Sequence, residues 1–153
     1  MHRLELRIPP PVVALLIAAA MWGLARATLS AEPSSSLRMV IAITIALAGV
    51  GFDIAGLLAF RRARTTVNPL KPDATSSVVM SGIYRYTRNP MYVGMVLLLL
   101  AWTTWLWSAW ALLGPLAFVL YISRFQIAPE EKILARKFGS DFAEYCEKVR
   151  RWL

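Results

Sequence analysis

Long apolar runs separated by short charged segments dominate this chain. The runs cover about residues 11–29, 39–60, 90–107 and 109–127. A helix needs about 20 apolar residues to cross the hydrocarbon core of a bilayer, because each residue adds only about 1.5 Å of rise. The first two runs have this length. Residues 91–122 carry no charge and are too long for one helix, so they predict a helical hairpin that turns near Trp107 and Ser108.

This pattern predicts an all-α integral membrane bundle of about four transmembrane helices, in which the third and fourth form the hairpin. We expect residues 1–153 to form a single membrane domain, with a cytoplasmic connection at 61–89 and a cytoplasmic, helical tail at 128–153. The first run follows a short basic segment, as the apolar part of a signal peptide does. It lacks a convincing small-residue cleavage site, so we expect a retained helix.

The basic residues are distributed unevenly among the connections. Six lie in residues 61–89 and six beyond Arg124, whereas the link between the first two runs holds only Arg38. Because Lys and Arg accumulate on the cytoplasmic side of membrane proteins, both termini and the second connection are expected there. The net charge of +8 is explained in the same way, and by contact with anionic membrane lipids. We therefore expect no nucleic-acid partner.

One candidate site lies where the third run begins. Asn89 and Pro90 form a favourable helix start, since Asn is a preferred N-cap and Pro suits the first helical position. The N-terminus of a helix attracts anions. Arg88 adds positive charge beside it, and Tyr84 and Tyr92 add aromatic faces with hydroxyl groups. The structural alternative is an ordinary capped helix with arginines that only set the topology.

Three further positions bring charge close to the predicted membrane. Glu130 and Glu131 follow Pro129 at the start of the tail, where acids also suit a first helical turn. Arg124 lies inside the end of the fourth run, and Asp53 is the only acid within any run. Ionisable groups at such depth usually face protein or water and often serve function. The single histidine, His2, and single cysteine, Cys146, argue against a metal site.

Taken in order, these residues resemble a known pattern. The segment from Gly82 to Gly94, an apolar hairpin, Arg124 and the Glu130-Glu131 pair are similar to the superfamily of isoprenylcysteine carboxyl methyltransferases and phospholipid methyltransferases. The match is completed by Leu134, Phe138, Gly139, Tyr145 and Arg150. It covers roughly residues 68–152. The order and spacing of the set carry the resemblance, since no single piece is specific.

The resemblance implies a membrane methyltransferase that uses S-adenosylmethionine. It places Tyr84, Arg88, Asn89, Pro90, Tyr92, Gly94, Glu130 and Glu131 in the cofactor site. It gives catalytic roles to Arg124 and Glu131, and Arg124 would lie near the transferred methyl group and the substrate's polar head. Asp53 is a further candidate for substrate contact. The eukaryotic enzymes have histidine where this chain has Asn89, so any acid-base role of that histidine is missing here.

The methyl acceptor stays open at this point. The family methylates carboxylates, amines and thiols, and the expected partner is a lipid-like or membrane-partitioned molecule. One alternative is an NADPH-dependent membrane reductase with the architecture of sterol reductases, although this tail offers few groups for a whole dinucleotide. Another is a small membrane protein without enzymatic activity. The oligomeric state is not indicated by the sequence.

Overall fold

The computed structural model describes residues 5–28, 35–63 and 78–153, and all its regular elements are helices. In chain order these elements are α1 (Pro10–Ala27), α2 (Ser35–Arg62), the short 3₁₀-helix η2 (Gly82–Arg85), α3 (Pro90–Leu106), the 3₁₀-helix η3 (Ala109–Leu112), α4 (Leu113–Ile122), the π-helix η4 (Ser123–Ile127) and α5 (Ala128–Lys148). Residues 64–77 of the predicted connection lie outside the described part.

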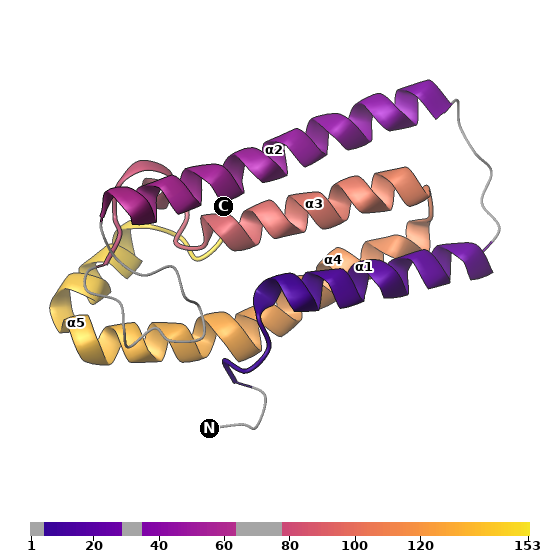
Figure 1. The fold of residues 1–153 in the computed structure, drawn as a ribbon. Helices are drawn as coiled ribbons and strands as arrows, with labels where there is room; N and C mark the ends of the chain where they lie inside the picture. Colours follow the sequence, from indigo (N-terminus) through magenta and orange to yellow (C-terminus); the bar gives the residue numbers. More distant parts are fainter. Residues whose placement is uncertain (1–4, 29–34, 64–77) are drawn as a thin grey trace.

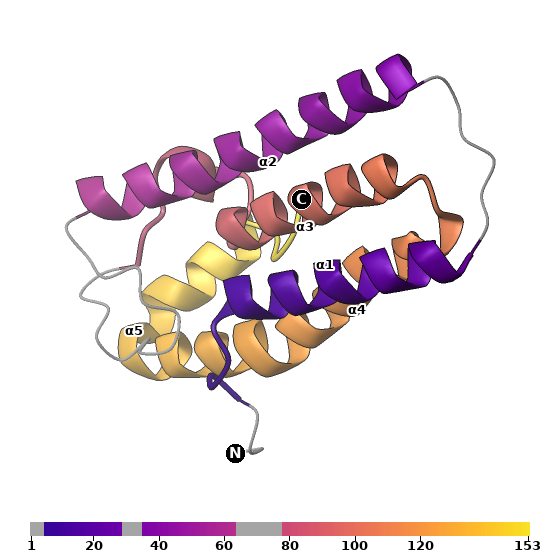
Figure 2. The same ribbon diagram turned by 45° about the vertical axis from the view of Figure 1, so that its right-hand side comes forward.

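The long helices lie alongside one another in an elongated bundle (Figure 1). α2 packs along α3, and α1 packs against both α3 and α4. The start of α1, the end of α2, the start of α3 and the C-terminus lie toward the same end of the bundle, and α5 folds back there (Figures 1 and 2). The predicted site residues at the starts of α3 and α5 are therefore brought to one end of the molecule.

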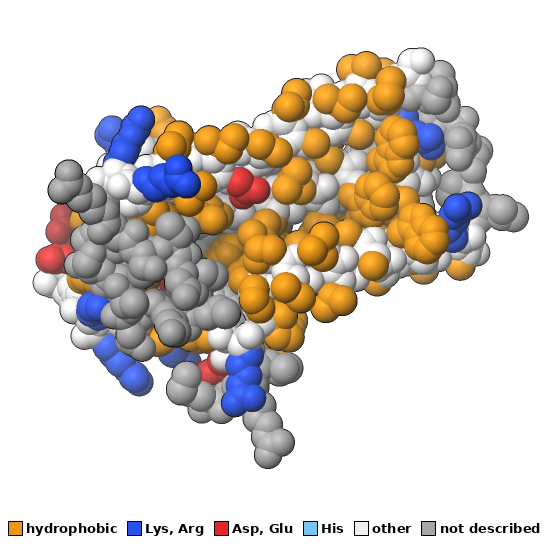
Figure 3. All heavy atoms as spheres, in the orientation of Figure 1, with side chains coloured by type: hydrophobic (Ala, Val, Ile, Leu, Met, Phe, Trp, Pro, Cys, Tyr) orange, Lys and Arg blue, Asp and Glu red, His pale blue; other side chains and the backbone are white. Residues whose placement is uncertain are grey.

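Apolar side chains cover the outside of the bundle as well as its interior. Leu15, Leu47 and Leu120 are each more than 60% exposed, at 70%, 67% and 63%. Figure 3 shows orange side chains over the length of the bundle, with most Lys and Arg side chains at its two ends. Such a surface suits lipid and not water. α1, α2 and the continuous helix Ala109–Lys148 are long and apolar enough to cross a membrane, and α3 is a shorter apolar helix. The predicted fold class, an all-α integral membrane bundle, is confirmed.

The hairpin turns at the predicted residues. Trp107 ends α3 in the left-handed backbone region, with φ of 50°, and its N–H donates to the carbonyl of Thr103. This geometry reverses the chain and satisfies a carbonyl group that the helix end would leave unpaired. Trp102, one turn earlier, donates its indole N–H to the carbonyl of Ala18 on α1 at 3.0 Å. The hairpin is thus anchored to the first helix.

Glycines allow α2 and α3 to approach closely. A Cβ on Gly49 of α2 would lie 2.9 Å from the carbonyl oxygen of Gly94 on α3, and a Cβ on Gly94 would lie 2.8 Å from that of Gly49. Seven residues further along α2, which is about two turns, a Cβ on Gly56 would meet Met91 at 2.7 Å. Small residues at these positions are what let two membrane helices pack backbone to backbone. This contact fixes the start of α3 against α2.

The helix that runs on from α4 into α5 contains two irregularities, each with a cause in the sequence. Pro129 has no N–H, so it cannot donate to the carbonyl of Phe125 four residues earlier. The N–H of Leu6 donates to that carbonyl instead, at 3.1 Å, and residues Ser123–Ile127 widen into the π-helix η4. Further on, Gly139 has φ of 52° and kinks α5. The predicted C-terminal helix is therefore two helical segments, and the second turns back toward α3.

Candidate active site

The start of α3 is built largely as the sequence predicts. Asn89 occupies the N-cap position, and its carbonyl accepts hydrogen bonds from the N–H groups of Tyr92 and Val93, both at 3.0 Å. Its side chain does not cap the helix. The Asn89 amide instead donates to the backbone carbonyl of Arg151 at 2.9 Å. The loop before α3 is held to the C-terminus of the chain by this bond and by a second, from the N–H of Arg88 to the carbonyl of Arg150, also at 2.9 Å.

Glu130 is brought to the first turn of α3. The hydroxyl of Tyr92 donates to the Glu130 carboxylate at 3.3 Å, and Gln126 is a further hydrogen-bond partner of Tyr92. Tyr84 is buried nearby, and its own hydroxyl is close enough to Glu130 for the carboxylate to help raise the pKa of Tyr84, after the larger effect of burial. The tyrosines predicted from the sequence therefore gather around one acid of the Glu130-Glu131 pair.

The Glu130 carboxyl group is enclosed by protein, although part of the residue reaches the surface. It lies beyond Ile127, where the last apolar run ends. The pKa of Glu130 is raised to about 7, chiefly by burial; the hydrogen bond from Tyr92 lowers it in part, and the neighbouring Glu131 adds a smaller increase. An enclosed acid whose pKa is near neutrality can release its proton to water at little cost when a cationic ligand binds beside it. This marks Glu130 as a functional candidate.

Glu131 has a different environment from its neighbour. It forms an ion pair with Arg88 at 3.1 Å and receives two hydrogen bonds from Arg151, from Nε at 3.1 Å and from Nη2 at 2.5 Å. Arg88 also donates to the sulfur of Cys146. The paired acids predicted from the sequence are thus divided between two roles: Glu130 is enclosed among hydroxyl groups, and Glu131 is held between two guanidinium groups.

Arg124 lies apart from these groups. Its guanidinium pairs with Glu5 of the N-terminal segment at 3.2 Å and is half-exposed. On a regular helix Arg124 and Glu131, seven residues apart, would share a face. The π-helix between them adds a residue to one turn and rotates this register. Gln126, which is buried, faces Tyr92 instead. The catalytic role expected for Arg124 remains a prediction.

Asp53 lies in the contact between α2 and α3. A Cβ on Gly94 would come within 2.2 Å of its Oδ1, so the absence of a side chain at Gly94 makes room for this carboxylate. Asp53 Oδ1 is buried and has no hydrogen-bond partner within the described ranges. Residues 92 and 94 point to different sides of α3, since each helical residue turns by about 100°. Asp53 therefore approaches α3 from the α2 side and Glu130 from the α5 side.

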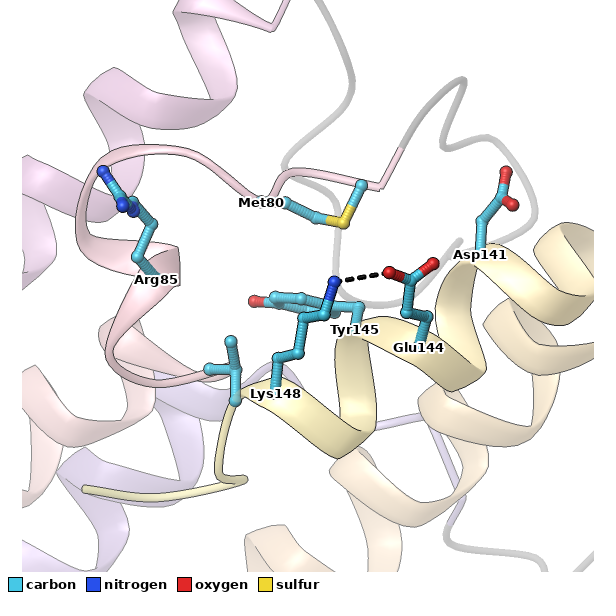
Figure 4. Close-up of a pocket in the computed structure, with 7 residues that line it drawn as sticks. Met80, Arg85, Asp141, Glu144, Tyr145 and Lys148 are labelled. Carbon is cyan, nitrogen blue, oxygen red and sulfur yellow. Dashed lines mark hydrogen bonds and ion pairs between the residues drawn. The ribbon is translucent and has the colours of Figure 1, made fainter.

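A hollow of about 540 Å³ adjoins this cluster (Figure 4). It lies between the η2 region and the last turns of α5, and its lining residues are Met80, Arg85, Asp141, Glu144, Tyr145, Lys148 and Val149. Lys148 is paired with Glu144 across one helical turn. The hydroxyl of Tyr145 donates to the carbonyl of Tyr84 at 2.8 Å, so this side chain links the hollow to the cluster around Glu130. None of the candidate residues predicted from the sequence lines the hollow.

Two residues of the cluster were not predicted from the sequence. Gln126 offered no motif, although the proline three residues later indicated that the helix would be irregular there. Arg151 stands 20 residues from Glu131, and only the kink at Gly139 and the return of the chain bring them together. A basic residue near the end of a membrane protein is ordinary, so its position alone carried no signal.

Comparison with known proteins now bears on this site. The model of the family "Phospholipid methyltransferase" matches residues 37–141. An uncharacterized protein of Haemophilus influenzae is 52% identical over 63 residues, which are 41% of this chain and the whole of that protein. No solved structure matches. The family match spans α2, α3, α4 and most of α5, including both acids and the start of α3. The chain belongs to the phospholipid methyltransferase family.

Proposed function

We propose that this protein is an S-adenosylmethionine-dependent membrane methyltransferase that acts on a lipid-like acceptor. One observation carries the proposal: an enclosed carboxyl group at the start of α5 lies close to two guanidinium groups, one from the loop before α3 and one from the residues after α5. Glu130 is hydrogen-bonded to Tyr92, and Glu131 forms ion pairs with both Arg88 and Arg151. Family membership and the lipid-facing surface of the bundle support the same function.

The donor set fits the cofactor. S-adenosylmethionine presents an ammonium group, a carboxylate and a ribose diol, and it supplies a methyl group activated by a sulfonium centre. Glu130 is suited to accept hydrogen bonds from the ammonium or the diol. Arg88 is suited to the carboxylate, because a guanidinium can donate two parallel hydrogen bonds to it. Catalysis would then rest mainly on holding the acceptor in line with the methyl group.

Asp53 is our candidate for the residue that contacts the methyl-accepting substrate. Its buried Oδ1 has no hydrogen-bond partner among the residues that the structure describes, and such a group inside a membrane bundle is costly and is usually retained for function. Among the three acceptor chemistries of this superfamily it favours an amine, which can donate to it, and disfavours a carboxylate, which it would repel. We assign Arg124 to the anionic part of a lipid head group; its half-exposed guanidinium, paired with Glu5, supports this role.

S-adenosylhomocysteine should stabilise the purified protein against heat, because a ligand that binds only the folded state raises the free energy of unfolding with the logarithm of its concentration over Kd. It keeps the ammonium, the carboxylate and the diol of the cofactor. A thermal-shift titration in detergent would measure the effect, with NADPH as the control. A shift with NADPH alone would support the reductase alternative, and no shift with either would support a protein without enzymatic activity.

Asp53→Asn should lower methyl transfer at least tenfold and leave S-adenosylhomocysteine affinity close to that of the wild type. Asparagine keeps the shape beside Gly94 and removes the charge, so the ligand-free protein should be as stable or more stable. The assay uses radiolabelled cofactor with a lipid extract, followed by separation of the labelled lipid. Full turnover in this variant would return Asp53 to a structural role.

A further inference from the structure

The last five residues form a C-terminal strap, residues 149–153, that returns from α5 to the start of α3. Figures 1 and 2 show this segment running from the end of α5 to the N-terminal turn of α3. Val149 is buried with Phe142 and Tyr145, and Trp152 packs against the main core. Apolar contacts on both sides therefore fix the strap, and the residues between them are held at the candidate site.

The backbone of the strap occupies donors around the start of α3. The carbonyl of Arg150 accepts from the N–H of Arg88, and the carbonyl of Arg151 accepts from Asn89 at 2.9 Å and from the hydroxyl of Thr87 at 3.3 Å. These are groups that an anion at the helix N-terminus would otherwise use. A carboxylate ligand must therefore depend more on side-chain cations than the sequence alone suggested.

The side chain of Arg151 supplies such a cation and also holds Glu131. Its guanidinium grips both oxygens of Glu131, at 3.1 and 2.5 Å, while Arg88 approaches one of them at 3.1 Å. Arg151 is the most exposed of the three, with 41% of its side chain accessible against 15% for Arg88 and 19% for Glu131. Two positive charges and one negative charge leave this group with a net charge of +1, and Arg151 lies on its outer side.

We infer that the C-terminal strap is a working part of the cofactor site, in which Arg151 is a positioning residue that fixes Glu131 and, through it, Arg88. This inference rests on the proposed function. Without Arg151, Glu131 has only one cation to orient it, and Arg88 is neutralised by an unshared carboxylate. The local net charge then falls from +1 to 0, which weakens attraction for an anionic ligand group.

The chain offers a matched control in Arg150. Arg150 is the neighbouring residue and is exposed, and its hydrogen bond at the site is made by its backbone carbonyl, which an alanine would keep. Arg151→Ala should weaken binding of S-adenosylhomocysteine about tenfold or more, measured by isothermal titration calorimetry, whereas Arg150→Ala should change it less than threefold. Arg151→Lys should recover little of the loss, because an ammonium cannot grip both oxygens as a planar guanidinium does. Thermal stability without ligand should be similar in the two alanine variants.

A double-mutant cycle separates positioning from a general loss of structure. If Arg151 acts through Glu131, Arg151→Ala should have less than half of its effect on the logarithm of Kd in the Glu131→Gln background. Additive effects, or equal affinity in the Arg151→Ala and Arg150→Ala variants, would overturn the inference. If the Arg151→Ala variant is too unstable to measure, the same cycle with Arg151→Lys tests whether Arg151 acts through Glu131. Wild-type protein that binds no S-adenosylhomocysteine would instead refute the proposed function.

Discussion

Gly94→Ala should destabilise the protein more than any other single methyl group added at a described glycine of α2 or α3. The new Cβ would lie 2.2 Å from Asp53 Oδ1 and 2.8 Å from the carbonyl oxygen of Gly49. The Asp53 side chain can rotate away, but the Gly49 carbonyl belongs to a helix backbone and can move only if α2 moves. Overpacking of this kind typically costs about 1–3 kcal/mol. We expect a fall of several degrees in the thermal midpoint, measured in detergent without ligand.

Gly51 of α2 provides the control for this substitution. A Cβ there meets nothing within 4 Å, so Gly51→Ala should be neutral or slightly stabilising through helix propensity. Adding Asp53→Ala to Gly94→Ala removes one of the two clashes and should restore only part of the stability. If Gly94→Ala melts at the wild-type temperature, the close backbone contact between α2 and α3 is not required for the fold.

The helical membrane fold could be predicted from the sequence because it depends on local properties. Apolar length determines which segments span, and Pro90 and the uncharged turn at Trp107 mark the start and the reversal of α3. The helix α2 covers Ser35–Arg62 and so continues at both ends beyond the apolar run of residues 39–60, into polar residues. Hydropathy does not detect helical turns that continue beyond the apolar run, because hydrogen bonding and not burial maintains them.

The candidate site could be predicted only where its residues belong to local motifs. Asn89, Tyr92, Glu130 and Glu131 stand at helix starts, and the structure brings them to one end of the bundle. The contact of Arg151 with Glu131 depends on the kink at Gly139, whose φ of 52° no periodicity reveals. Gln126 faces Tyr92, whereas Arg124 does not, because the π-helix changes the helical register. Patterns among neighbouring residues predict neither contacts between distant parts of the chain nor a change of helical register.

The two acids of the pair should differ in what their removal does. Glu131 lies among cations, so its charge is compensated in the ligand-free protein. Glu130 is enclosed and its pKa is raised to about 7 from an ordinary value of 4.5, chiefly by burial. Because the folded state holds this proton more tightly than the unfolded state, stability from Glu130 is greatest below about pH 4.5 and declines as pH rises through 7. The ligand-free protein should therefore melt at a lower temperature at pH 8 than at pH 6.

Glu130→Gln should weaken S-adenosylhomocysteine binding about ten- to a hundredfold at pH 8, the loss expected for one hydrogen bond to a charged group of roughly 1.5–3 kcal/mol. Glutamine resembles the protonated acid, so the ligand-free variant should be more stable than the wild type at pH 8. Its melting temperature should also change much less between pH 6 and pH 8 than that of the wild type. Wild-type affinity should rise over that range, because the ionised carboxylate is the form that binds a cation, and the variant's affinity should stay flat.

Calorimetric titrations and melting curves at pH 6, 7 and 8 measure both effects on the same samples. Glu131→Gln is the comparison: it removes the same charge from the next residue, but it leaves Arg88 and Arg151 without their shared partner and should lower stability at every pH. A variant that loses affinity while gaining stability identifies a residue kept for binding at the expense of the fold. If Glu130→Gln lowers stability at pH 8 or binds the ligand as the wild type does, Glu130 is a structural partner of Tyr92 and the cofactor's cationic group must be bound elsewhere.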